Sequence, residues 1–462
     1  MQRQLTISPV DGRVLVERDY ADGAQIERAL QRAQRAQAGW RRTDVETRAR
    51  ICRVFCDAFA AAAEEIAPEL SWQMGRPVAA APSEVRGTLD RARHMIDIAA
   101  AALTDVAVGD KPGFRRFIRR EPLGVVLTIA AWNYPYLIAI NSVIPALMAG
   151  NAVLLKHSAQ TPLCAERFAA AFATAGLPEA LFQVLHLTHE QTAQLIADSR
   201  IGYVAFTGSV QGGLAVQGAA STRVVGLGLE LGGNDPAYVR ADADFDQAVE
   251  NLVDGAFFNS GQSCCGIGRI YVADSLFARF VEASVALTRR YVLGDPLDPA
   301  TTLGPCVRAA AADAVRAVTR QAVADGARTL IDEAQFPMSR AGSPYLAPQI
   351  LIGVNQSMQV QREETFGPLV TIMSVNGDAE ALRHMNDSRY GLTASVWTRD
   401  AEAAMALGAS LATGTFFMNR CDYLDPALAW VGVKDSGRGC TLSSVGYEYL
   451  TRPKSFHLRL AS

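Results

Sequence analysis

Short apolar runs between residues 123 and 229 constrain the fold more than any other feature of this chain. They are rich in Val, Ile and Leu and lie at 123–129, 152–156, 182–186, 203–206 and 223–229. Amphipathic helical patterns separate them, near 136–149, 162–175, 189–198 and 210–219. Continuous apolar strands that alternate with helices predict an α/β fold with a parallel sheet covered on both faces. Such sheets bind ligands at the carboxyl ends of their strands, so a nucleotide-type site is expected in the first half.

The flanking segments complete an α/β architecture. Asp22 and Gln25 have the spacing of a capping box at the start of a helix, and Ala-rich helical patterns continue to about residue 105. After Asn234 the alternation repeats, with a strand at 236–239, a helix from Asp244, a strand at 269–274 and helices to about 327. A strand-and-loop region, one helix, one strand and a Gly-rich tail follow from Tyr345. These patterns predict a second α/β domain, with a boundary near residue 232.

The segment 122–155 contains no charged residue, which raises the alternative of a membrane span. Three prolines and three asparagines interrupt it, however, and a bilayer would leave their backbone and amide groups without partners. A buried α/β core is the better explanation.

Charge and cysteine content exclude several classes of protein. Lys plus Arg number 44 and Asp plus Glu 47, which gives a net charge of −3. A chain with this balance has no long-range electrostatic attraction for nucleic acid or an anionic membrane. Eight cysteines are too few for a disulfide scaffold, and the first residues lack the apolar core of a signal peptide. A cytoplasmic protein is expected. No cysteine or histidine spacing matches a zinc site, so no metal is predicted.

Two adjacent cysteines, Cys264 and Cys265, lie between Gly261 and Gly266 in a predicted turn from helix to strand. An ordinary thiol is only slightly ionised at neutral pH, so a nucleophilic cysteine needs a site that activates it. A pair of buried apolar cysteines is the alternative. The flanking glycines favour a site, because they let the backbone approach a ligand closely.

Three other segments fall on loops at the predicted sheet edge. Glu230 ends a core strand in GLELGGN, where it is either a base with a raised pKa or the partner in a salt bridge. Asn133 follows another strand and is either an oxyanion donor or a helix cap. Gly208 and Gly213 frame a strand-to-helix turn whose N–H groups suit a pyrophosphate.

Taken together, these segments resemble the aldehyde dehydrogenase superfamily along nearly the whole chain. The matching segments are 131–135, 154–158, 206–209, 230–234, 258–265, 363–368, 386–392 and 432–437. The resemblance implies a Rossmann-like NAD(P)-binding domain (1–104 and 122–232), a catalytic domain (233–444) and a small β oligomerisation arm (105–121 and 445–462). It also implies a homodimer or homotetramer.

The resemblance assigns roles by position. Cys264 matches the nucleophile, Glu230 the general base and Asn133 the oxyanion donor. Positions expected to line the cofactor cleft are Ile129, Trp132, Lys156, Gly208, Ser209, Leu231, Glu364 and Phe366. Positions expected to contact substrate are Tyr134, Ile138, Asn141, Ser263, Cys265, Leu424 and Trp430.

The implied activity is the oxidation of an aldehyde to a carboxylic acid with NAD, through a thiohemiacetal and a thioester on Cys264 that water activated by Glu230 hydrolyses. Ala159 stands where the family often has an acidic residue that would repel a 2′-phosphate, so NADP is also possible. An apolar tunnel would suit a neutral aldehyde, whereas Arg420 and Asp422 would favour a charged one. The alternatives are a CoA-acylating enzyme of the same fold and a non-catalytic protein that has kept the fold.

Overall fold

The computed structural model describes residues 3–460. The apolar runs of the first half form one six-stranded sheet, in the order β17-β9-β8-β5-β6-β7. Its strands are β5 (Val125–Ala130), β6 (Ala152–His157), β7 (Phe182–Val184), β8 (Ile201–Thr207), β9 (Gly226–Glu230) and β17 (Gly437–Arg438). All neighbours are parallel except β17, which runs antiparallel to β9. The predicted parallel sheet is confirmed.

Helices cover this sheet and share its hydrophobic core. They are α1 (Gly23–Trp40), α2 (Val45–Ala61), α3 (Ala63–Met74), α4 (Ala81–Ala102), α5 (Pro135–Met148), α6 (Pro162–Thr174), α7 (His189–Ala197) and α8 (Val210–Ala220). The capping box of Asp22 and Gln25 is present at the start of α1. The uncharged segment forms β5, α5 and β6 inside this core, and within residues 3–460 no helix is long and apolar enough to cross a membrane.

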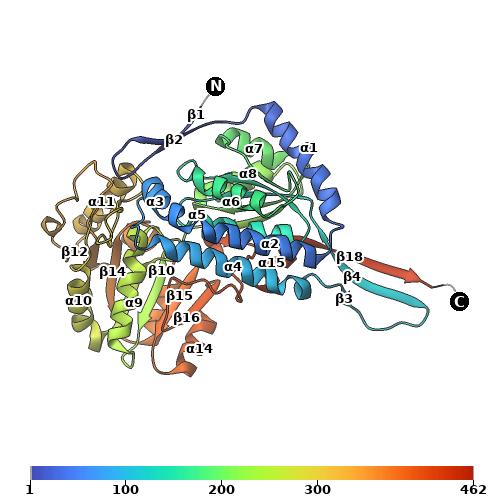
Figure 1. The fold of residues 1–462 in the computed structure, drawn as a ribbon. Coiled ribbons are helices and arrows are strands. Elements are labelled where there is room, and N and C mark those ends of the chain that lie inside the picture. Colours follow the sequence, from blue (N-terminus) through green and yellow to red (C-terminus); the bar gives the residue numbers. More distant parts are fainter. Residues whose placement is uncertain (1–2, 461–462) are drawn as a thin grey trace.

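A second, seven-stranded sheet has its own core. Its order is β12-β13-β14-β11-β10-β15-β16, with β10 (Asp235–Val239), β11 (Ile267–Ala273), β12 (Arg328–Thr329), β13 (Gln349–Ile352), β14 (Leu369–Val375), β15 (Thr393–Trp397) and β16 (Thr415–Met418). The helices around it are α9 (Phe245–Phe257), α10 (Asp274–Thr288), α11 (Ala309–Ala324), α12 (Gln359–Arg362), α13 (Asp378–Asn386) and α14 (Ala401–Ser410). Figure 1 places α9, α10 and α14 on one side of the molecule and α6, α7 and α8 on the other.

The prediction for the last quarter of the chain was incomplete. One helix and one strand were expected after residue 375, but α14 and β16 follow α13 and β15. Helix α14 buries only Ala404 and Leu407, and β16 is four half-buried residues long, so neither has a strong apolar pattern.

A three-stranded antiparallel sheet projects from the body at the right of Figure 1. It contains β3 (Val106–Ala107), β4 (Phe114–Pro122) and β18 (Thr451–Arg459), and β4 pairs with β18 over nine residues. The rings of Phe117 and Phe456 stack across this pair at 4.6 Å. The predicted arm segment from residue 445 begins within helix α15 (Ser443–Tyr449), which precedes β18. The arm prediction at 461–462 lies outside the described residues.

Candidate active site

A cavity of about 380 Å³ lies where the carboxyl edge of the first sheet meets the loop that precedes β11. Its wall combines residues of α4, α5 and α9 with the end of β9 and two loops, at 263–265 and 421–430. Cys264 and Glu230 both line it. Two residues 34 positions apart in sequence therefore face the same space.

The loop that carries Cys264 is held in a tight conformation. A short 3-10 turn, Phe258–Gly261, follows α9, and Asn259 and Ser260 within it adopt left-handed backbone angles, with φ of 53° and 56°. A Cβ on Gly261 would collide with the carbonyl of Gly367, so only glycine fits there. The Gln262 amide donates to the carbonyl of Asn259 at 3.0 Å and accepts from the Val307 N–H at 2.8 Å. These contacts fix the backbone on which the thiol is mounted.

Three thiols line the cavity, those of Cys264, Cys265 and Cys421. Cys265 is buried and its thiol donates to Asp422 at 2.9 Å; its hydrogen bond with Cys264 and its burial raise its pKa well above the usual value. Burial likewise raises the pKa of Cys421. Cys264 and Cys421 are both half-buried, and the Cys421 thiol donates to the Asn251 carbonyl at 3.4 Å. Of these two half-buried thiols, Cys264 lies on the loop that the Asn133 amide contacts. The sequence analysis missed Cys421.

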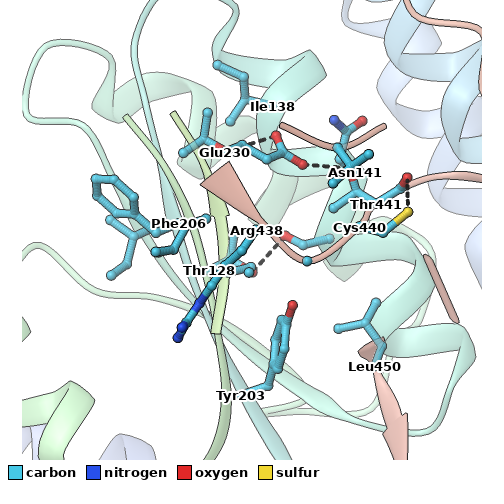
Figure 2. Close-up of a pocket in the computed structure, with 18 residues that line it drawn as sticks. Thr128, Ile138, Asn141, Tyr203, Phe206, Glu230, Arg438, Cys440, Thr441 and Leu450 are labelled. Carbon is cyan, nitrogen blue, oxygen red and sulfur yellow. Dashed lines mark hydrogen bonds between the residues drawn. The ribbon is translucent and has the colours of Figure 1, made fainter. Parts of the chain in front are cut away.

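Glu230 ends β9 with its carboxyl group between two hydroxyl donors (Figure 2). Thr441 donates to it at 2.5 Å and Thr207 at 3.2 Å. Burial raises the pKa of Glu230, which the two threonine hydrogen bonds only partly oppose. Within residues 3–460 Glu230 has no ion pair, so the salt-bridged alternative is wrong. Glu230 also lines a second, small cavity of about 20 Å³, with space for about one water molecule.

Asn133 lies in the loop between β5 and α5 and is buried. Its side-chain N–H donates to the Gln262 carbonyl at 3.1 Å, so the amide reaches the nucleophile loop directly. The helix-cap alternative is wrong, because Glu84 of α4 accepts the N–H of Tyr136 at 2.9 Å in the first turn of α5. A primary amide has two N–H groups, so one remains for another acceptor.

A buried ion pair that the sequence analysis missed supports this loop. Arg76 and Glu84 pair with side chains about 1% exposed. Arg76 also donates to the backbone carbonyl of Asn133 at 2.6 Å and to the Asn259 side chain at 3.3 Å. Glu84 meanwhile accepts at the N-terminus of α5. The pair therefore joins the two segments that carry Asn133 and Cys264, and removing either partner would leave a buried charge alone.

The predicted cofactor positions gather along one sheet edge, as expected for parallel strands. They include Ile129 and Lys156 near the ends of β5 and β6, Gly208 and Ser209 after β8, and Leu231 after β9. Ser209 caps α8 by accepting the Gly212 N–H at 3.1 Å. Across from them, the ring of Phe366 meets Trp132 edge-on at 5.7 Å.

This edge has the chemistry that a dinucleotide requires. Burial lowers the pKa of Lys156, whose amino group has no partner among residues 3–460, and burial raises the pKa of Glu364 to about 7. Glu364 accepts the Gly233 N–H at 3.0 Å, and a Cβ on Gly232 would collide with its carboxyl group. A cation and a carboxylate can bind ribose hydroxyls, and the N-terminus of α8 can bind a pyrophosphate.

All seven predicted substrate positions line the large cavity: Tyr134, Ile138, Asn141, Ser263, Cys265, Leu424 and Trp430. Asp422 lines it too and accepts from Ser263 at 2.9 Å. Arg420 does not line the cavity and stacks on the ring of Tyr423, which does. Sequence reasoning missed Arg91 and Asp254, which come from helix faces with no motif around them.

Comparison with known proteins gives a consistent result. The sequence model of the "Aldehyde dehydrogenase family" matches residues 2–456. An aldehyde dehydrogenase of Paenarthrobacter nicotinovorans is 35% identical over 444 residues, 96% of each chain. The succinate semialdehyde dehydrogenase [NAD(P)+] Sad of Escherichia coli K12 is 34% identical over 96% of this chain and 95% of its own. The crystal structure of an NAD-dependent aldehyde dehydrogenase from Sinorhizobium meliloti superposes with a TM-score of 0.95, at 30% identity, over 100% of this chain and 92% of that one.

Proposed function

Since the chain belongs to the aldehyde dehydrogenase family and is an NAD(P)-dependent oxidoreductase, we propose that Cys264, Glu230 and Asn133 convert an aldehyde into a carboxylic acid in the large cavity. The observation that carries these assignments is the shared cavity: a half-buried thiol and a half-buried carboxyl group with a raised pKa line one space.

The reaction begins with the Cys264 thiolate, which attacks the aldehyde carbonyl and forms a C–S bond. The resulting oxyanion accepts hydrogen bonds from the Asn133 amide and the backbone N–H of Cys264. A dinucleotide held at the sheet edge would supply the hydride acceptor through its nicotinamide ring. As the carbonyl re-forms, carbon loses the hydride and a thioester remains on Cys264.

Hydrolysis of the thioester is the step assigned to Glu230. Its carboxylate takes a proton from water, the hydroxide adds to the thioester carbon, and the C–S bond breaks to release the acid. The sulfur leaves as a thiolate, ready for another aldehyde. Thr207 and Thr441 hold the carboxylate in place through this step.

The positions at the sheet edge are proposed to bind the cofactor. Lys156 and Glu364 would hold ribose hydroxyls, Gly208 and Ser209 the pyrophosphate, and Phe366 would pack near the nicotinamide. Ile129, Trp132 and Leu231 would line the remaining cleft. Position 159 is an alanine, so no carboxylate there would repel the 2′-phosphate of NADP. This supports use of NADP as well as NAD.

One experiment separates this function from its rivals. Purified protein is mixed with NAD or NADP and a panel of aldehydes, with and without CoA, while reduced nicotinamide is followed by its absorbance. Reduction without CoA is expected, because a water-activating Glu230 has no use in acyl transfer to CoA. Reduction only with CoA would instead support the acylating enzyme, and no reduction with any aldehyde would support a non-catalytic protein.

Loss of the Asn133 amide should slow the chemical step. We expect Asn133→Asp, which keeps the size but removes the N–H donor, to lower kcat by about 10²–10³. Steady-state kinetics with a thermal melt alongside would check this, since Asn133 also hydrogen-bonds Gln262. A folded variant with unchanged kcat would remove Asn133 from the oxyanion site.

The projecting sheet supports an assembly of identical chains. Strand β18 lies at its edge with most of its residues exposed, and an exposed strand edge is a liability in a monomer. We therefore expect a homodimer or homotetramer that uses this arm, which comprises residues 105–121 and 445–462. We assign residues 1–104 and 122–232 to the cofactor domain and residues 233–444 to the catalytic domain. Light scattering should give a mass of two or four chains, and a monomer would contradict the assignment of the arm.

We propose a cytoplasmic location from the state of the cysteines. All eight are free thiols, which suits the reducing cytoplasm.

A further inference from the structure

Arg91 is a buried cation in the wall of the large cavity. It comes from α4, is 9% exposed and lines the same space as Cys264. One terminal nitrogen, Nη1, donates to the Leu137 carbonyl at 3.0 Å and to the Asn141 side-chain oxygen at 3.1 Å. Both acceptors are neutral. Within residues 3–460 no carboxylate lies at ion-pair distance from Arg91.

The other buried arginines differ from Arg91 in this respect. Arg48 donates to three backbone carbonyls from two nitrogens. Arg76 pairs with Glu84, and Arg269 donates to three backbone carbonyls. In Arg91 the Nε and Nη2 groups have no protein partner among the described residues, and neither is enclosed by protein atoms. The Nε–Nη2 edge of its guanidinium is therefore unpaired, and Arg91 lines the cavity.

The open edge has the geometry of a carboxylate receptor. Nε–H and Nη2–H point in the same direction and match the two oxygens of a carboxylate with parallel hydrogen bonds. The neighbouring Asn141 is 3% exposed, and its side-chain N–H groups also have no partner in the described part of the chain. A buried charge without a partner is unfavourable, so a ligand that supplies an anion here relieves that cost.

The acidic residues of the cavity do not supply this partner. Asp422 accepts from Ser263 and Cys265 and is occupied by these donors. Glu230 lines the same cavity and its charge acts on Arg91, but its carboxyl group is hydrogen-bonded by Thr441 and Thr207 and forms no ion pair with Arg91 among the described residues. Asp90 is exposed, where water and salt screen its charge, and burial together with Asp422 raises the pKa of Asp254. An anion in direct contact with Arg91 would interact in a buried, low-dielectric environment, so its attraction to the guanidinium outweighs repulsion from the more distant carboxylates of Glu230 and Asp422.

We propose that Arg91, assisted by Asn141, selects aldehydes that carry a carboxylate at the far end of a short chain, the semialdehydes of dicarboxylic acids. This inference rests on the proposed function, because the aldehyde end must reach Cys264 while the acid end binds Arg91. It assigns to the cavity a charged rather than a neutral substrate.

The test compares three aldehydes of equal length on the wild-type enzyme with saturating cofactor: 4-oxobutanoate, butanal and 4-aminobutanal. We expect kcat/KM for the acid to exceed that for butanal by about 30-fold or more, the range for hydrogen bonds to a charged group. In Arg91→Gln the ratio of the two values should fall close to one, and Arg91→Lys should keep part of it. Arg86→Gln, which removes an exposed charge from the same helix outside the cavity, should leave the ratio at its wild-type value.

The ratio separates the possible failures. Equal kcat/KM for the acid and butanal on the wild-type enzyme, or a higher value for 4-aminobutanal, would overturn the role of Arg91 while leaving the proposed oxidation intact. A fall in both rates in Arg91→Gln with an unchanged ratio would show that Arg91 acts through Glu230 or on folding, and would also overturn it. No reduced nicotinamide with any of the three would instead count against the proposed function.

Discussion

Cys264→Ala should abolish aldehyde oxidation, with kcat reduced by at least about 10⁴-fold, the scale observed when a covalent nucleophile is removed. No thiohemiacetal can form without this sulfur, so neither a first turnover nor steady turnover should remain. Stopped-flow measurement of reduced nicotinamide, with enzyme in excess over aldehyde, would detect even a single turnover.

The other cavity thiols provide matched controls for this loss. Cys265→Ala removes the adjacent buried thiol and Cys421→Ala removes the one from the opposite loop. Each should lower kcat by no more than about tenfold, equivalent to about 1.4 kcal/mol in the barrier. If the Cys265 variant is the inactive one and Cys264→Ala still turns over, the nucleophile has been assigned to the wrong sulfur.

Glu230→Gln should retain one rapid turnover per active site and then stall. Attack and hydride transfer do not need the carboxylate, whereas hydrolysis of the thioester needs a base. General-base catalysis contributes about 10²–10⁴-fold, so steady turnover should fall by that factor while the burst remains. The burst amplitude should equal the concentration of active sites.

The same step sets an expected pH dependence. Burial raises the pKa of Glu230, and only the ionised carboxylate can accept a proton from water. Steady-state kcat of the wild-type enzyme should therefore fall as pH decreases through this raised pKa, at a pH above the ordinary value of about 4.3 for Glu. In Glu230→Gln this limb should be missing from the residual turnover.

Glu364→Gln is a suitable contrast, because Glu364 is also a half-buried residue with a raised pKa but lies at the cofactor edge. It should raise KM for the dinucleotide and slow the burst itself. A burst followed by a stall in this variant, and not in Glu230→Gln, would mean that the water-activating carboxylate had been misidentified.

The sheet of the first half could be predicted because its strands are buried on both sides. Strand β5 is buried at all six positions, and such continuous apolar runs are strong signals. Helix α14 and strand β16 bury few large side chains, so local pattern gave no sign of them. Helix α15 in the tail was not predicted, because its seven residues bury only Ser443, Gly446 and Tyr447.

The site shows the same division between local motif and long-range contact. Glu230 and Cys264 stand in Gly-containing motifs that are visible in sequence, and the predicted substrate positions do line one cavity. The Arg76–Glu84 pair and the open edge of Arg91 could not be predicted, because each depends on helices packed against a distant segment. Likewise, Thr441 lies 211 positions from the carboxyl group that it binds.

The most direct test of the central claim, that Cys264 and Glu230 act on one substrate, is to trap the intermediate in Glu230→Gln. After one turnover with aldehyde and cofactor, intact-protein mass spectrometry should show one acyl group per chain, and fragmentation of the peptide should place it on Cys264. In the Cys264→Ala, Glu230→Gln double variant the adduct should disappear. An acyl group on Cys265 or Cys421, or a Glu230→Gln enzyme that turns over steadily without accumulating any adduct, would contradict the account.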